Sequence, residues 1–127
     1  EGVVRESYCG MPCQIRMDFF NPDRGIIDLK TCDDLTWFES DAKRYGYIHQ
    51  AAFYRAILGN ATASIYPVYI IAVEKKQPFR CGVWCIGSTA LDFAATENAT
   101  AIERLKKCRA ENVWPTGYEE IRIMENI

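Results

Sequence analysis

The chain has 127 residues, of which 25% are charged and 49% hydrophobic, the usual composition of a globular domain that buries its own core. Its 15 lysines and arginines are matched by 17 aspartates and glutamates, so the net charge of -2 excludes nucleic-acid or membrane binding by bulk charge alone. A single histidine, His49, excludes His-rich metal sites, and no apolar run approaches the ~20 residues of a membrane span. We therefore expect one soluble domain over residues 1–127.

The first third of the chain predicts two β-hairpins. Val3–Tyr8 and Cys13–Phe20 are rich in β-branched and aromatic residues, and a glycine and a proline lie between them as turn residues. Residues 21–25 (Asn-Pro-Asp-Arg-Gly) form a dense turn signal, which the apolar stretch Ile26–Thr31 follows. This stretch is expected to pair with the end of the preceding strand.

The rest of the chain alternates helices and strands, up to an ambiguous tail that begins at Trp114. The middle strand is apolar on both faces, as expected of a buried central strand. The predicted elements are a helix from Asp33 or Asp34 to Leu58, a strand at Ile65–Val73, a strand at Phe79–Ile86 and a helix at Ser88–Ala110. Their order predicts an α/β or α+β sheet protein.

The second hairpin brings two acidic residues together. If its turn is centred on Asp23, residues equally far from Asp23 face each other across the hairpin. Asp18 then lies opposite Asp28, and Arg16 opposite Lys30. Because side chains alternate along a strand, Asp28 and Lys30 share one face, which we expect to be polar. The other face is expected to belong to the core, with Met17, Phe19, Ile27 and Leu29.

Two facing carboxylates predict a hard divalent cation. At ~5 Å between Cβ atoms they repel each other unless something compensates their charge. Mg²⁺ or Mn²⁺ prefers such oxygen ligands, and with a lysine beside it can activate water for attack on a phosphodiester. The alternative from spacing alone is an exposed charged hairpin face without function.

Three ordered motifs carry a family resemblance. They are Arg-Met-Asp at 16–18, Gly-Ile-Ile-Asp-Leu-Lys-Thr at 25–31 and Tyr-Ile-His-Gln-Ala-Ala-Phe-Tyr at 47–54. Together they resemble the PD-(D/E)xK nuclease superfamily, and within it the phage-type, exodeoxyribonuclease VIII-like exonucleases. The resemblance covers Val3 to Leu58 and implies a restriction-endonuclease-like α/β fold, with a mixed central sheet flanked by helices.

The resemblance also implies roles for individual residues. Asp18 and Asp28 would be catalytic metal ligands for Mg²⁺ or Mn²⁺, and Lys30 would orient the attacking water or steady the developing charge. Gln50 and Tyr54, four residues apart on one helix face, would hold DNA near the metal.

Arg16, the first residue of the Arg-Met-Asp motif, is a basic residue near the expected site, and we expect it to contact DNA phosphates. The activity implied is a metal-dependent exonuclease that digests duplex DNA from its ends in phage-type recombination or repair. A single-strand annealing protein, a ring-like homo-oligomer and a cytoplasmic location in a bacterial or phage-encoded system are further implications. Relatives of this kind carry a helix before the first strand that supplies a further metal ligand, and we expect the given sequence to lack that helix.

Three other functions remain open. The chain could be a non-catalytic or incomplete nuclease-fold DNA-binding module, or a structure-specific or CRISPR-associated nuclease of the same fold. The C-x3-C pairs Cys9/Cys13 and Cys81/Cys85 could instead form a zinc-thiolate module. Free thiols are the favoured interpretation of the six cysteines.

Overall fold

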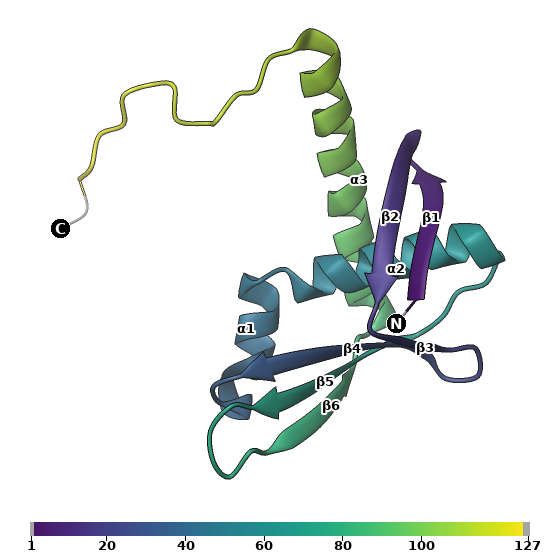
Figure 1. Cartoon of the computed structure of the whole chain (residues 1–127). Helices are drawn as coiled ribbons and strands as arrows, with labels where there is room; N and C mark the ends of the chain where they lie inside the picture. The colour runs from purple at the N-terminus through teal and green to yellow at the C-terminus, as the bar shows by residue number, and fades with distance from the viewer. Residues whose placement is uncertain (1, 126–127) are drawn as a thin grey trace.

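Two β-sheets and three α-helices make up residues 2–125, the part of the chain that the computed structural model describes (Figure 1). The elements are β1 (Gly2–Tyr8), β2 (Met11–Met17), β3 (Phe19–Asn21), β4 (Gly25–Cys32), the 3-10 helix η1 (Leu35–Trp37), α1 (Phe38–Arg44), α2 (Tyr47–Thr62), β5 (Val68–Glu74), β6 (Cys81–Cys85) and α3 (Ser88–Glu111). Residues 113–125 form neither helix nor strand. The predicted α/β architecture, a mixed sheet flanked by helices, is confirmed.

The larger sheet has the strand order β3-β4-β5-β6. Its central pair, β4 and β5, is parallel, and the outer pairs are antiparallel. Parallel neighbours need a crossover connection, which here consists of η1, α1 and α2. Strands β1 and β2 form a separate antiparallel ribbon, whose turn has positive φ at both Cys9 and Gly10, as tight hairpin turns require. Both predicted hairpins are therefore present.

The helices cover one face of the four-stranded sheet. On this face Ile26 and Val68 belong to one buried cluster with Ala52 of α2, and Ile70 belongs to another with Phe38 of α1. Helix α3 in turn packs against α2 (Figure 1). The β1–β2 ribbon lies on α2 as well, where the rings of Tyr8 and Phe53 meet edge to face.

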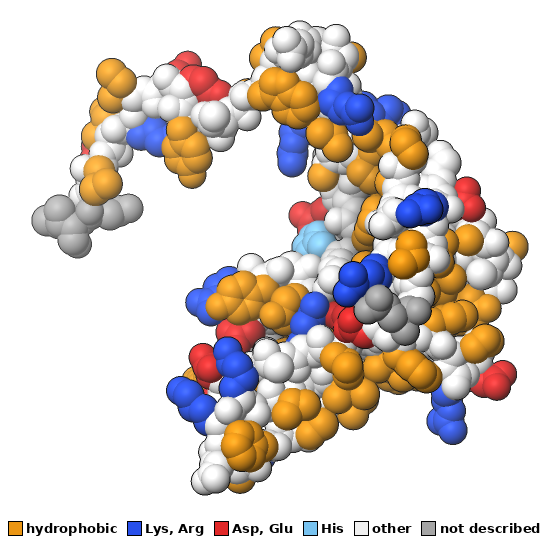
Figure 2. Space-filling model, viewed as in Figure 1, with side chains coloured by type: hydrophobic (Ala, Val, Ile, Leu, Met, Phe, Trp, Pro, Cys, Tyr) orange, Lys and Arg blue, Asp and Glu red, His pale blue; other side chains and the backbone are white. Residues whose placement is uncertain are grey.

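The expected assignment of the two faces of β4 is wrong. Asp28 and Lys30 lie on the face that α1 and α2 cover, whereas Leu29 is 58% exposed and Phe19 is 49% exposed on the other face. The cause is the crossover: helices that connect two parallel strands with the usual right-handed sense must lie over one particular face. Figure 2 shows hydrophobic side chains at the surface over the sheet end of the molecule. Those of the open face include Phe19, Leu29, Val73 and Val83.

The single helix expected from Asp33 or Asp34 to Leu58 is also wrong. Asp34 does cap a helical turn, by accepting a hydrogen bond from the Thr36 N–H, but that turn is the short η1. The following helical segment stops at Arg44, and α2 begins at Tyr47 after Gly46, which has φ of 74°. A left-handed residue breaks the helical hydrogen-bond pattern and lets α2 take a new direction across the sheet.

Smaller differences concern the ends of elements. The expected strand at Ile65–Val73 begins only at Val68, and Ile65 is exposed in the preceding loop. Strand β5 is central, as expected, but only its helix-covered face is fully buried.

All six cysteines are free thiols in the structure. Within residues 2–125, no helix has the length and apolar character needed to cross a membrane.

Gly46→Ala is expected to lower the free energy of unfolding by about 1 kcal/mol, because alanine is strained at positive φ. A Cβ atom at this position would have no neighbour within 4 Å, so no steric clash contributes. Urea unfolding measures the change. Gly46→Asn is the control: asparagine tolerates this conformation better and should lose less. Equal losses in both variants would contradict the conformational explanation.

Candidate functional site

The candidate site begins where the ladder between β3 and β4 ends. The expected register is confirmed, because the pairs are Phe19↔Ile27, Phe20↔Ile26 and Asn21↔Gly25. The ladder stops there: Met17 pairs with Gly2 of β1, and Arg16 pairs with Val3. The expectation that Arg16 lies opposite Lys30 is therefore wrong, because β2 leaves the sheet to form the ribbon with β1.

Asp18 occupies the break between β2 and β3. Its Oδ2 atom accepts a hydrogen bond from the Leu29 N–H at 2.8 Å. Continued pairing would have placed Met17 opposite Leu29, so the Asp18 carboxylate takes the backbone donor that β2 leaves without a strand partner. This bond fixes Asp18 beside Asp28, the residue next to Leu29, and the expected juxtaposition of the two acids is realised.

The two acids have different environments. Asp28 is only 7% exposed, and burial raises its pKa above the ordinary value, with a further contribution from its hydrogen bond to Asp18. The pKa of Asp18 is lowered, mainly by the same hydrogen bond and then by the bond from the Leu29 N–H. When the pair holds one proton, Asp28 carries it and donates to the Asp18 carboxylate. The pair thus resists carrying two negative charges.

Lys30 is the positively charged residue beside the two acids, on the helix-covered face of β4. Its Nζ atom lies 2.9 Å from Asp28 Oδ2 and donates a hydrogen bond to Gln50 Oε1 at 2.8 Å. Gln50 Nε2 in turn donates to the Tyr54 hydroxyl at 3.0 Å. The structure thus joins Gln50 and Tyr54 of α2 to the residues of β4 in one hydrogen-bonded chain.

Tyr47 is a site residue that the sequence reasoning missed. The Lys30 Nζ atom lies 4.4 Å from the centroid of its ring. The only available signal was that Tyr47 precedes Gln50 by three residues, which places both on one side of a helix.

Arg16 lies on the exposed side of β2, and its positive charge contributes to the lowered pKa of Asp18.

The residues of this site fit a small divalent cation. Two carboxyl groups meet side by side, and burial together with this contact raises the pKa of Asp28. Residues 2–125 contain no group of three His, Cys, Asp or Glu side chains arranged around a metal. A cation would therefore bind two carboxylates from the described residues and complete its shell with water, as Mg²⁺ readily does. Asp18 and Asp28 remain the predicted ligands.

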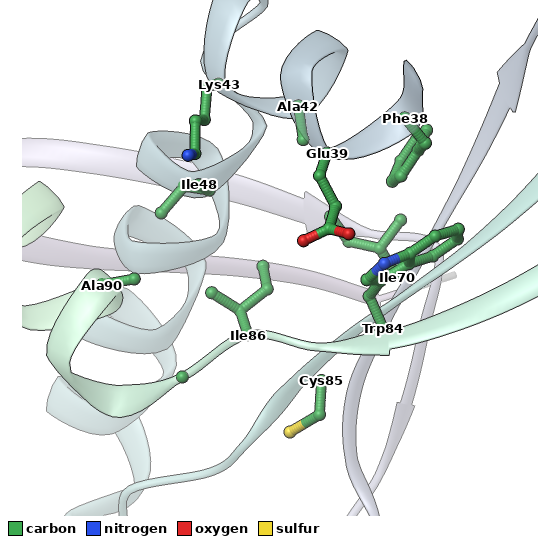
Figure 3. Close-up of a pocket in the computed structure, with 11 residues that line it drawn as sticks. Phe38, Glu39, Ala42, Lys43, Ile48, Ile70, Trp84, Cys85, Ile86 and Ala90 are labelled. Atoms are coloured by element: carbon green, nitrogen blue, oxygen red, sulfur yellow. The ribbon is translucent and has the colours of Figure 1, made fainter. Parts of the chain in front are cut away.

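A separate cavity of about 190 Å³ lies between α1, β6 and the start of α3 (Figure 3). It is lined mainly by apolar side chains, among them Phe38, Ile48, Trp84 and Ile86. Asp18, Asp28, Lys30, Gln50 and Tyr54 do not line it. The candidate site is therefore distinct from this cavity.

Comparisons with known proteins agree with the fold and with the expected superfamily. A family model described as "PDDEXK-like domain of unknown function (DUF3799)" matches residues 1–126. A crystal structure of a "putative exonuclease" from Eubacterium rectale superposes with a TM-score of 0.80 over 99% of this chain, at 18% sequence identity. The chain spans 53% of that protein's length. No curated protein sequence matches. The expected membership of the PD-(D/E)xK superfamily is confirmed.

Asp28→Asn is expected to gain stability relative to the wild type as the pH rises, in buffer without divalent cations. The folded state holds the Asp28 proton more tightly than the unfolded state, because its pKa is raised above 3.8. The resulting stability is present at low pH and is lost as the pH rises through the raised pKa. Asparagine has no such proton to lose.

Urea unfolding of both proteins between pH 4 and pH 8 measures this difference. Asp23→Asn, on an exposed turn residue, is the matched control. If the stability of Asp28→Asn minus that of the wild type stays level or falls as the pH rises, the assignment of the raised pKa to Asp28 is contradicted.

Proposed function

The chain belongs to the family of PDDEXK-like domains, and on that basis we propose that it is a metal-dependent deoxyribonuclease that digests duplex DNA from its ends. The observation that carries the proposal is the meeting of Asp18, Asp28 and Lys30 at one point of the sheet. This set of side chains suits phosphodiester hydrolysis. Two carboxylates can bind a divalent cation, and a lysine can compensate negative charge on the scissile phosphate.

Asp18 and Asp28 would hold Mg²⁺ or Mn²⁺. The cation, when bound, supplies an activated water and compensates charge on the phosphate. Asp28 must be ionised to bind it, so the cation and the proton of the pair compete for the same carboxylate. Asp18 keeps its position because the Leu29 N–H holds one of its oxygens.

Lys30 would orient the attacking water or donate to the phosphate. Its side chain is only 16% exposed, and its ammonium group lies 2.9 Å from Asp28 Oδ2, so it reaches the same small space as the carboxylates. Gln50 and Tyr54 would act at the DNA end next to the metal, and Arg16 would contact phosphates from the exposed side of β2.

The wider role is proposed from the resemblance to phage-type exonucleases. Duplex DNA ends are the proposed substrate, in phage-type recombination or repair. A single-strand annealing partner, a homo-oligomer and a cytoplasmic location belong to the same proposal. The E. rectale protein is about twice as long as this chain, so further parts of a whole protein can contribute to substrate choice.

A second candidate function is an incomplete nuclease-fold module that binds DNA without cutting it. The observation in its favour is that residues 2–125 offer no third acidic or histidine ligand beside Asp18 and Asp28. Such a module would bind metal weakly and leave DNA intact.

The proposed activity is tested with linear and covalently closed duplex DNA in Mg²⁺ or Mn²⁺. We expect loss of linear DNA only, and a loss of rate of at least ~100-fold in Asp28→Asn and in Lys30→Gln, because both groups act on the reacting phosphate. Asp23→Asn and Lys76→Gln, on exposed residues outside the site, are matched controls and should keep the wild-type rate. Release of acid-soluble nucleotides measures the rate.

The other outcomes separate the alternatives. Cutting of closed circular DNA would show that the protein is an endonuclease of the same fold and not an exonuclease. Binding of DNA without cutting would favour the incomplete module. Full activity in both Asp28→Asn and Lys30→Gln would exclude this site as the catalytic centre.

Metal binding has its own test, which does not depend on activity. Millimolar Mg²⁺ or Mn²⁺ should raise the thermal unfolding midpoint of the wild type, because a ligand that binds only the folded state stabilises it. The rise should be larger at pH 8 than at pH 5, because Asp28 must lose its proton first. An equal rise in Asp18→Asn and Asp28→Asn would show that the cation binds elsewhere.

A further inference from the structure

The Lys30 ammonium group has contacts on three sides. Asp28 Oδ2 and Gln50 Oε1 lie 2.9 Å and 2.8 Å from its Nζ atom, and the Tyr47 ring centroid lies 4.4 Å away. Gln50 Oε1 accepts a hydrogen bond from the ammonium group, and Asp28 Oδ2 forms an ion pair with it. The third is the face of an aromatic ring, which attracts a cation through its negative quadrupole. Such an attraction is stronger where water is largely excluded, and the Lys30 side chain is only 16% exposed.

The Tyr47 ring is itself held in place by other rings. Its centroid lies 6.1 Å from that of Phe38, which is buried in the core between α1 and the sheet. Phe38 in turn packs against Trp84 of β6, with centroids 4.7 Å apart. Tyr47 is the first residue of α2, directly after the left-handed Gly46. The ring therefore has a fixed position relative to the sheet that carries Lys30.

Asp28 and Gln50 do not by themselves fix the direction of the Lys30 side chain throughout a reaction. Asp28 is the proposed metal ligand, and Gln50 is proposed to act on the DNA end, so both can exchange Lys30 for another partner during a reaction. Tyr47 has no such competing role. Its ring face is the contact that stays the same while charge and hydrogen bonds beside Lys30 change.

We propose that Tyr47 is a positioning residue for Lys30: its ring face holds the ammonium group in the direction that the nuclease reaction requires. The catalytic part of this inference rests on the proposed function of the site, because it matters for the rate only if Lys30 acts in the reaction. The contact itself can be tested without any activity.

The first measurement is the proton chemical shift of the Lys30 ε-methylene group, observed by NMR with ¹³C-labelled lysine and assigned by its absence from Lys30→Met. The current of an aromatic ring shifts protons above its face upfield, so the wild type should show an upfield Lys30 resonance. Tyr47→Phe should keep this shift and Tyr47→Leu should lose it. A Lys30 resonance at the ordinary lysine position in the wild type would overturn the proposal, even if a variant fails to fold.

The second measurement is the steady-state rate on linear DNA. Tyr47→Leu should lower kcat by about 5- to 30-fold, the range expected for a largely desolvated cation–π contact, with little change in KM. Tyr47→Phe, which keeps the ring, should recover most of this loss. Tyr45→Leu is the matched control: its ring packs against Tyr47 with centroids 5.9 Å apart, but it is 59% exposed and the cation over it is Arg44.

The outcomes separate the two proposals. Equal losses of kcat in Tyr47→Phe and Tyr47→Leu would assign the effect to the hydroxyl group and overturn the role of the ring face. A fall in kcat without any change of the Lys30 resonance would overturn it as well. A wild type that binds cations but cuts no DNA would contradict the proposed function. The NMR measurement would still test whether the Tyr47 ring holds the Lys30 ammonium group in place.

Discussion

The carboxyl groups of Asp18 and Asp28 meet on a sheet face that two helices cover, and the surrounding residues respond to the charge of this pair. Ionising both acids at so short a distance, with Asp28 buried, is unfavourable without a cation. The raised pKa of Asp28 reflects this cost, and Lys30 beside it offsets part of the negative charge. A divalent cation that binds here competes with a proton, so we expect both the stability and the proposed function to depend on pH.

Lys30 connects the acids to the helical layer. It lies on β4, yet two of its three partners, Gln50 and Tyr47, belong to α2. The position of α2 depends on the break at Gly46 and on the rings that pack Tyr47 against α1. The local backbone therefore affects the chemistry: a change that tilts the start of α2 would move both the amide and the ring that direct the lysine.

The sequence predicted the meeting of the two acids better than it predicted their surroundings. A strong turn signal centred on Asp23 set the register of β3 and β4, and the register brought Asp18 to Asp28. Hydrophobic alternation failed for the same strand, because it places Leu29 inside, whereas the crossover helices bury the charged side. The separation of β2 from β3 depends on pairing with β1, and the contact of Tyr47 with Lys30 joins residues far apart in the chain. Neither feature follows from turn signals or from hydrophobic alternation in the sequence.

The most direct test of the site is a crystal structure of the protein grown with Mn²⁺, with data collected where manganese scatters anomalously. The proposed arrangement predicts an anomalous peak in contact with the carboxylate oxygens of Asp18 and Asp28, with Lys30 beside it, and no peak there in crystals of Asp28→Asn. A manganese ion bound elsewhere, with the two carboxyl groups still hydrogen-bonded to each other at saturating Mn²⁺, would contradict the assignment of these residues as the metal site.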